Sequence, residues 1–157
     1  MEQDESPAVS RQVPIVPYLQ LPVAPGEVAH LVGSRCQQCG ETYLGARKIC
    51  LKCLSVDGLR EAALSRHGTV FTFTVVHHSA PWVKVPYVAG VVKLPEGPLV
   101  RSVITDDESS EEVVVGMPVE MTTEIIRRDA TGNDIVAYRF RKTSNGRSLV
   151  NQGGQRE

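Results

Sequence analysis

Apolar and polar residues alternate over short runs in the second half of the chain, with the two-residue period that is typical of β-strands. The clearest run is 69–77, Thr-Val-Phe-Thr-Phe-Thr-Val-Val-His, which is rich in β-branched and aromatic residues. The alternation places Phe71, Phe73 and Val75 on one face of a strand. We expect this apolar face to point into the core of the protein.

Four further runs have the same character and are separated by turn sequences. They cover residues 87–94, 99–105, 119–127 and 135–141. The pattern predicts a mostly β chain in which five strands with little helix form a small closed or nearly closed antiparallel barrel of the OB type. The acidic segment 106–112 is expected to lie on the surface, and the polar, glycine-rich tail from residue 145 is expected to fray.

The first 29 residues differ from the rest because they contain five prolines, too many for a continuous helix or a central strand. The apolar residues in this arm are too numerous for a solvated linker, so either the rest of the chain or a partner covers them. Residues 26–33 leave two alternatives open, a short helix or an approach to a strand at 30–35.

All four cysteines fall within eighteen residues, as Cys36, Cys39, Cys50 and Cys53. Two Cys-X-X-Cys pairs this close together are typical of a metal site, and four thiolates suit tetrahedral zinc. Gly40, directly after the second cysteine, allows the backbone to turn tightly around the metal. Because four ligands leave no open position, this zinc is expected to be structural rather than catalytic.

Two other interpretations of the cysteines are a rubredoxin-like iron centre and a redox-active Cys-X-X-Cys pair, although ligand preferences favour zinc. About twenty residues cannot bury a core alone. Metal binding would therefore hold this segment together. The basic neighbours Arg35, Arg47, Lys48 and Lys52 would offset the negative charge of a zinc centre with four thiolate ligands.

The charge balance argues against a protein that holds nucleic acid by bulk electrostatics. Lys and Arg number 17 against 18 Asp and Glu, a formal charge of −1, whereas nucleic-acid binding usually needs a clear basic excess. No apolar stretch approaches the ~20 residues that cross a bilayer, so we expect no membrane span. The N-terminal Met-Glu-Gln-Asp-Glu-Ser is acidic where a secretory signal would be basic and then apolar. We therefore expect a cytoplasmic protein with reduced thiols.

A four-cysteine ribbon leads directly into the barrel motifs Gly68-Thr-Val-Phe-Thr-Phe-Thr-Val and Pro86-Tyr-Val-Ala-Gly-Val-Val-Lys-Leu-Pro-Glu-Gly-Pro. Over about residues 28–142 this arrangement resembles the acyl-CoA-associated zinc-ribbon/OB-fold proteins. That family commonly has a proline just before the arginine of the ribbon loop and another after the third cysteine, where this chain has Ala46 and Leu51. The expected division is a proline-rich docking arm at 1–29, a zinc ribbon at 30–58, an OB-fold barrel at 59–144 and a flexible tail at 145–157.

The resemblance implies an accessory subunit rather than a free-standing enzyme. In such complexes a thiolase-like partner supplies the catalytic cysteine and histidine, while the small subunit packs over the mouth of the CoA site. We therefore expect a non-catalytic subunit of a complex that cleaves or forms a C–C bond in an acyl-CoA, in a degradation pathway. A dimeric partner would make this complex a heterotetramer. The expected ligands are structural Zn²⁺ and a CoA or acyl-CoA shared with the partner.

Trp82, the only tryptophan, lies in a loop between the first and second barrel strands. One interpretation is an interface anchor or a platform on which the adenine ring of CoA stacks, and the other is a plug that closes one end of the barrel. His77 and His78 end the first strand. They are best explained as strand-end polar residues, with the alternative that His78 contacts the thioester or pantetheine arm.

Arg139, Arg141 and Lys142 form a basic stretch at the end of the last strand. Arginine forks suit the phosphate groups of CoA. Charges that alternate along an edge strand, however, are also typical of a solvated face that discourages aggregation. Both interpretations remain open from the sequence.

The alternative function is that of a single-stranded nucleic-acid-binding module, with Phe71 and Phe73 as stacking partners of bases. The near-zero net charge argues against this function, and so does the simpler assignment of these two rings to the core. The sequence also has no GxSxG elbow, HExxH pair or Gly-rich phosphate loop, so we do not expect an independent enzyme.

Overall fold

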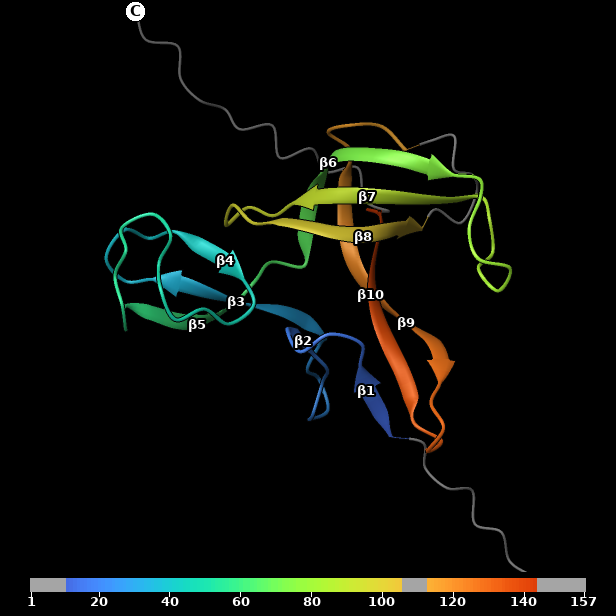
Figure 1. The fold of residues 1–157 in the computed structure, drawn as a ribbon, viewed down its shortest axis with the longest axis horizontal. Helices are drawn as coiled ribbons and strands as arrows, with labels where there is room; N and C mark the ends of the chain where they lie inside the picture. Colours follow the sequence, from blue (N-terminus) through green and yellow to red (C-terminus); the bar gives the residue numbers. More distant parts are fainter. Residues whose placement is uncertain (1–10, 106–112, 144–157) are drawn as a thin grey trace, which may run out of the picture.

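The computed structural model describes residues 11–105 and 113–143, which form ten β-strands and no helix (Figure 1). The strands are β1 (Gln12–Pro14), β2 (Leu19–Gln20), β3 (His30–Cys36), β4 (Thr42–Leu44), β5 (Leu59–Ala63), β6 (His67–Val76), β7 (Tyr87–Lys93), β8 (Leu99–Thr105), β9 (Pro118–Arg128) and β10 (Asp134–Lys142). The acidic segment 106–112 and the tail from residue 145 lie outside the described residues. Within the described ranges no helix is long and apolar enough to span a membrane.

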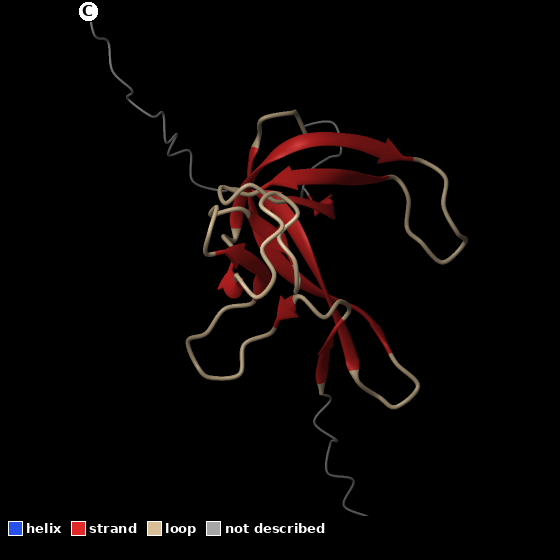
Figure 2. Ribbon diagram, turned by 60° about the vertical axis from the view of Figure 1, so that its left-hand side comes forward, coloured by secondary structure: helices blue, strands red, loops and turns tan. Residues whose placement is uncertain are grey.

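Five strands close into a barrel, and they overlap the five runs that the sequence predicts. The order around the barrel is β6, β7, β8, β10 and β9, and β9 pairs with β6 to close it. One pairing corrects the expected all-antiparallel barrel: β8 and β10 are parallel, because β9 lies between them in the chain. Apolar side chains fill the interior, and Val92, Val100, Val119 and Phe140 are fully buried. The β9–β10 hairpin projects beyond the barrel with β1 beside it (Figures 1 and 2).

The prediction that Phe71 shares the core face of its strand is wrong, because β6 contains a β-bulge. The register between β6 and β7 shifts between Val70 and Thr72, so Phe71 is an extra residue. The bulge changes which residues point inward. Val70 is buried and Phe73 packs against the core, whereas Phe71 is 53% exposed.

The ribbon is a small sheet built around β3. This strand pairs antiparallel with β4 and with β5, and its first residues pair with β2. Of the two alternatives for residues 26–33, the structure therefore has the approach to a strand. The sequence analysis starts the barrel at residue 59, which is the first residue of β5. In the structure β5 pairs with β3 and therefore lies in the ribbon sheet. Gly33 at the centre is tightly packed, since a Cβ there would lie 2.4 Å from the carbonyl oxygen of Tyr43.

The chain itself covers part of the proline-rich arm. Leu19 is 2% exposed and belongs to the same apolar cluster as Leu31, Leu64 and the barrel core. The ring of Tyr18 packs against that of Tyr138 on β10, with 6.2 Å between the ring centroids. One continuous apolar core thus connects the arm, the ribbon and the barrel.

Two tight turns of the ribbon, the knuckles, present the cysteine pairs and share one backbone pattern. In the first knuckle the N–H of Gly40 donates to the carbonyl oxygen of Cys36 (3.0 Å), and in the second the N–H of Leu54 donates to that of Cys50 (2.9 Å). The residue that closes each turn has a left-handed backbone, with φ of 74° for Gly40 and 58° for Leu54. A leucine is disfavoured in this conformation because its Cβ crowds the backbone.

We expect substitutions at these two turn positions to change stability in opposite directions. Gly40→Ala should destabilise the protein by about 1 kcal/mol, because the left-handed backbone disfavours any Cβ, even though nothing lies within 4 Å of the added Cβ. Leu54→Gly should preserve stability or raise it by up to about 1 kcal/mol for the same reason, since Leu54 is 72% exposed and loses little packing. Urea unfolding of the metal-loaded protein, followed by far-UV circular dichroism, measures both effects. Changes of the same sign would show that the two turns are not equivalent.

Candidate functional site

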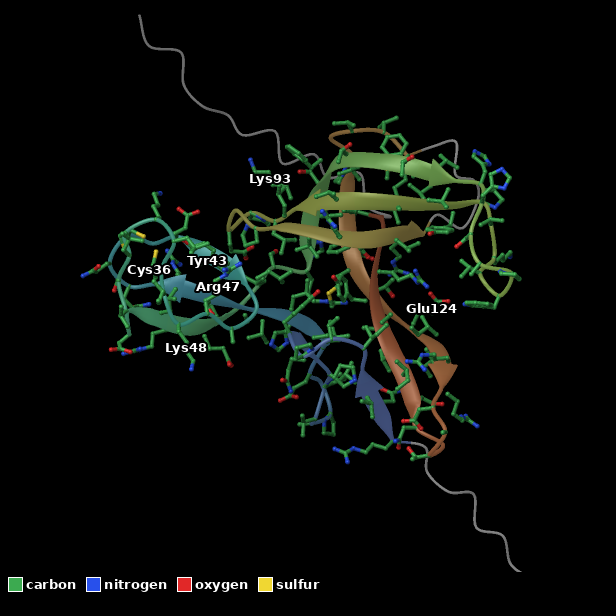
Figure 3. All side chains as sticks on the ribbon, viewed as in Figure 1. Cys36, Tyr43, Arg47, Lys48, Lys93 and Glu124 are labelled. Carbon is green, nitrogen blue, oxygen red and sulfur yellow. The ribbon has the colours of Figure 1, made fainter. Side chains whose placement is uncertain are left out.

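The structure brings the four predicted cysteines together at the tip of the ribbon. Their Sγ atoms all lie within 4.8 Å of one another, with 3.6 Å between Cys36 and Cys53 and 3.5 Å between Cys39 and Cys50. A tetrahedral ion with metal–sulfur bonds of ~2.3 Å holds its sulfur ligands about 3.8 Å apart. The four sulfurs are thus close to the arrangement that one metal ion requires, and Figure 3 labels Cys36 at this end of the molecule.

Tyr43, from β4, is a polar neighbour of this cluster. Its hydroxyl lies 3.4 Å from the Sγ of Cys50 and accepts a hydrogen bond from the N–H of Leu51 (3.1 Å). The hydrogen bond from Tyr43, together with the backbone N–H groups of Cys53 and Lys52, lowers the pKa of Cys50 to about 6. Cys50 is therefore favoured as a thiolate at neutral pH, which is the form that binds metals.

Three of the basic residues near the cysteines in sequence differ in their contacts. Lys52 forms a 2.8 Å ion pair with Glu41, which raises the pKa of Lys52. The guanidinium of Arg47 lies over the ring of Tyr43, 5.0 Å from its centroid, and Lys48 is exposed (Figure 3). The ring of Tyr43 thus packs under a cation while its hydroxyl faces a sulfur.

A cavity of about 670 Å³ lies between the β6–β7 loop and strands of the barrel. The loop contributes Trp82, Val83 and Lys84, and the strands contribute, among others, Tyr87, Ile104, Glu124, Ile126 and Arg139. Trp82 is 86% exposed, so it does not plug the barrel and lies at the surface of the cavity. Ile126 is the extra residue of a second bulge, between β9 and β10, which explains why it leaves the regular alternation.

Arg139 enters the cavity as one half of an ion pair. Its Nε donates to the carboxylate of Glu124 on the neighbouring strand β9. The side chain of Arg139 is 22% exposed and that of Glu124 is 53% exposed. An anion that binds to Arg139 therefore competes with the carboxylate of Glu124. Lys84, in the β6–β7 loop, is exposed to solvent.

The structure brings only two of the predicted CoA- or partner-binding residues together, Trp82 and Arg139. His78 is exposed at the end of β6 and does not line the cavity. Arg141 forms a 2.7 Å ion pair with Glu120 away from the cavity, and Lys142 is exposed near the end of β10. Arg139 and Arg141 thus lie two residues apart on β10, each paired with a different glutamate of β9, and only Arg139 lines the cavity.

Sequence reasoning missed two residues that the geometry singles out. Tyr43 has no spacing relation to the cysteines that would reveal its contact with Cys50, because the contact arises where the second knuckle folds back onto β4. Lys84 lies two residues after Trp82 in the same loop. This closeness in sequence could have identified Lys84 as a second lining residue of the cavity.

Comparisons with known proteins agree with this architecture. Residues 61–124 match the family described as "ChsH2, C-terminal OB-fold domain". The chain is 35% identical over 118 residues to a DUF35 domain-containing scaffold protein of Methanocaldococcus jannaschii, which covers 73% of this chain and 83% of that protein. It is 27% identical over 119 residues to the benzoylsuccinyl-CoA thiolase subunit BbsA of Thauera aromatica, which covers 76% of this chain and 81% of that subunit.

A solved structure has the same fold. A chain of the Ltp2-ChsH2(DUF35) aldolase superposes with a TM-score of 0.59 at 25% identity, over 72% of this chain and 84% of that chain. Two findings agree: the family match over residues 61–124 and the 35% identity to a scaffold protein along 73% of the chain. The chain belongs to the DUF35/ChsH2 OB-fold family, which the resemblance in its sequence had indicated.

Proposed function

We propose that the protein is a non-catalytic accessory subunit of a thiolase-like enzyme complex that cleaves or forms a C–C bond in an acyl-CoA. The observation that carries this proposal is the similarity, along 76% of the chain, to a protein named as a thiolase subunit. The similarity to a chain of an aldolase supports the same class of partner. With a dimeric partner the complex is a heterotetramer.

The chemistry of the described residues supports a non-catalytic role. Thiolase-like chemistry needs a nucleophile and an acid or base, and all four cysteines of the chain lie in the cluster at the ribbon. Neither cysteine nor histidine is among the described residues that line the cavity. The partner subunit therefore supplies the reacting groups.

The cysteine cluster is best explained as a structural zinc site. Cys36, Cys39, Cys50 and Cys53 would hold the ion with four sulfurs, which leaves no position for a substrate or water. Bound zinc would supply folding free energy to a segment that lacks an apolar core. Tyr43 would donate its hydroxyl proton to the Cys50 sulfur and so orient and stabilise that ligand.

The cavity is our candidate for the part of the CoA site that this chain contributes. Trp82 offers an exposed ring for stacking with adenine, and Lys84 and Arg139 offer cations for phosphate groups. Apolar residues such as Ile104 and Ile126 line the rest, which suits the pantetheine arm. His78, Arg141 and Lys142 lie outside the cavity, and any role for them lies in contacts with the partner.

One observation favours the alternative, a single-stranded nucleic-acid-binding module. Phe71 is exposed on β6 and presents an aromatic face that a base can stack on. Its neighbour Phe73 packs against the core instead, so the described strand offers one ring and not a platform. A steep dependence of binding to single strands on salt concentration would favour this alternative.

The zinc site predicts a specific role for the hydroxyl of Tyr43. We expect about one zinc per chain by elemental analysis, and Tyr43→Phe should release zinc to a chelator roughly 10-fold faster, because the outer hydrogen bond to a ligand is lost. The ring and its contact with Arg47 are retained in this variant. The matched control is Tyr87→Phe, in the cavity, which should release zinc at the wild-type rate. Iron in place of zinc, or equal rates for both variants, would contradict the assignment.

If CoA binds in the cavity, Lys84 and Arg139 should contribute to its affinity and Arg141 should not. Lys84→Gln and Arg139→Gln should each weaken CoA binding by roughly tenfold, because a charge-assisted hydrogen bond to a phosphate is lost. Arg141→Gln is the matched control, since Arg141 pairs with Glu120 outside the cavity. Quenching of Trp82 fluorescence, measured with the protein alone and with its partner bound, reports the binding. An unchanged Trp82 emission in both states, or equal weakening by Arg141→Gln, would exclude the cavity.

The subunit proposal predicts a stoichiometric partner. Tagged protein recovered from its native cell extract should carry a thiolase-like enzyme in a 1:1 ratio of chains, as measured by mass spectrometry and by light scattering of the eluted complex. Such a complex should cleave or form an acyl-CoA C–C bond, and the free small protein should not. Recovery of the protein alone, or with nucleic acid, would contradict the proposal.

A further inference from the structure

The second knuckle of the ribbon exposes four large apolar side chains within eight residues. The exposed fractions are 47% for Ile49, 63% for Leu51, 72% for Leu54 and 61% for Val56. Ile49 and Val56 form a bridge and lie opposite each other, and the N–H of Leu54 is held by the carbonyl of Cys50. Because the turn is fixed by these bonds and by the adjacent cysteines, the side chains cannot fold under the ribbon. We call residues 49–56 the knuckle surface.

The first knuckle shows that this turn does not need apolar residues. It reads Cys-Gln-Gln-Cys-Gly, whereas the second reads Cys-Leu-Lys-Cys-Leu. Gln37 and Gln38 are exposed polar residues at the positions that correspond to Leu51 and Lys52. The two turns share one backbone pattern, but the first presents polar side chains and the second apolar ones. The backbone of the turn therefore does not explain the apolar side chains of the second knuckle.

Leu54 is an independent sign that the knuckle surface has a function. It occupies a left-handed position, φ 58°, where the first knuckle has Gly40. A leucine here costs conformational free energy that a glycine would avoid, and its exposed side chain recovers little of that cost inside the chain. Strained positions that persist are typical of functional sites. The compensating contact is therefore expected outside the chain.

The charges beside the knuckle surface indicate the chemistry of its partner. Residues 46–57 contain three basic residues, Arg47, Lys48 and Lys52, and one acidic residue, Asp57. Lys52 forms an ion pair with Glu41, whereas among the described residues neither Arg47, which lies over the ring of Tyr43, nor Lys48 forms an ion pair. A complementary surface has an apolar hollow with carboxylates around it.

We propose that the knuckle surface is where the partner enzyme docks, with Leu51 and Leu54 as anchors in an apolar hollow rimmed by Asp and Glu side chains. This inference rests on the proposed function, since it names the contact through which the accessory subunit holds its enzyme. The ribbon and the β6–β7 loop lie at opposite ends of the molecule (Figure 1), so an enzyme docked on the knuckle surface would extend along the barrel to share the cavity of Trp82.

The test measures the affinity of the purified thiolase-like enzyme, obtained by co-purification with the wild-type protein, for zinc-loaded variants. Leu51→Ser and Leu54→Gly should each weaken binding by about tenfold or more, as apolar anchors at an interface do. Lys48→Glu should slow association and reduce its dependence on salt. The matched control is Val115→Ser, which replaces an equally exposed apolar residue (65%) on the barrel side and should bind normally.

Leu54→Gly keeps the test independent of folding, because this variant is expected to be at least as stable as the wild type. Affinities of Leu51→Ser and Leu54→Gly within twofold of wild type would overturn the docking inference and leave the proposed function intact. Failure of the wild type to bind any thiolase-like enzyme would overturn both. A wild-type dimer in sedimentation experiments that Leu51→Ser converts to a monomer would assign the knuckle surface to a second copy of this chain and overturn the inference.

Discussion

The meeting of four cysteine sulfurs at one point is the constraint on which the ribbon depends. From residue 36 to residue 56 the buried side chains are essentially those of Cys36, Thr42 and Cys50. Such a segment has no apolar core of its own. Leu44 packs against the core shared with the barrel, and the other long aliphatic side chains are exposed. Without a shared ion, the two knuckles would have only a few backbone hydrogen bonds to hold them. With an ion, the same bonds aim both cysteine pairs at one centre.

The ribbon and the barrel are linked by packing and not by a flexible connection. β3 ends at Cys36, and Leu31 near its start lies in the core shared with the barrel. The N–H of Leu64 donates to the carbonyl oxygen of Leu31 (2.8 Å). Leu19 from the arm fills the same core. The knuckle surface and the cavity are therefore held in a fixed relation, which suits a protein that positions an enzyme relative to a ligand.

Much of the fold could be predicted because its signals are local. Alternating apolar residues located the five barrel strands, and the cysteine spacing located the metal cluster. Phe71 was assigned wrongly because a bulge inserts one residue without any mark in the alternation. The contact of Tyr43 with Cys50 depends on how the second knuckle folds back, and the ion pairs of Arg139 and Arg141 depend on the pairing of β9 with β10. Sequence spacing reports neither.

Leu54 connects the stability of the ribbon with its proposed role. Its left-handed backbone is unfavourable for the free protein, and its exposed side chain lies beside a sulfur ligand. A metal bound by the cysteines would fix the turn, and the turn would present the side chain to a partner. The proposed docking would then depend on the metal through the shape of the knuckle and not through chemistry at the ion.

The most direct measurement is a titration of the purified partner enzyme with the protein before zinc removal, after zinc removal and after zinc is restored. We expect stoichiometric binding by the zinc-loaded protein, at least tenfold weaker binding by the stripped protein, and full recovery when zinc is added back. Equal binding by the stripped and loaded forms would contradict the claim that a metal-held ribbon joins this subunit to its enzyme.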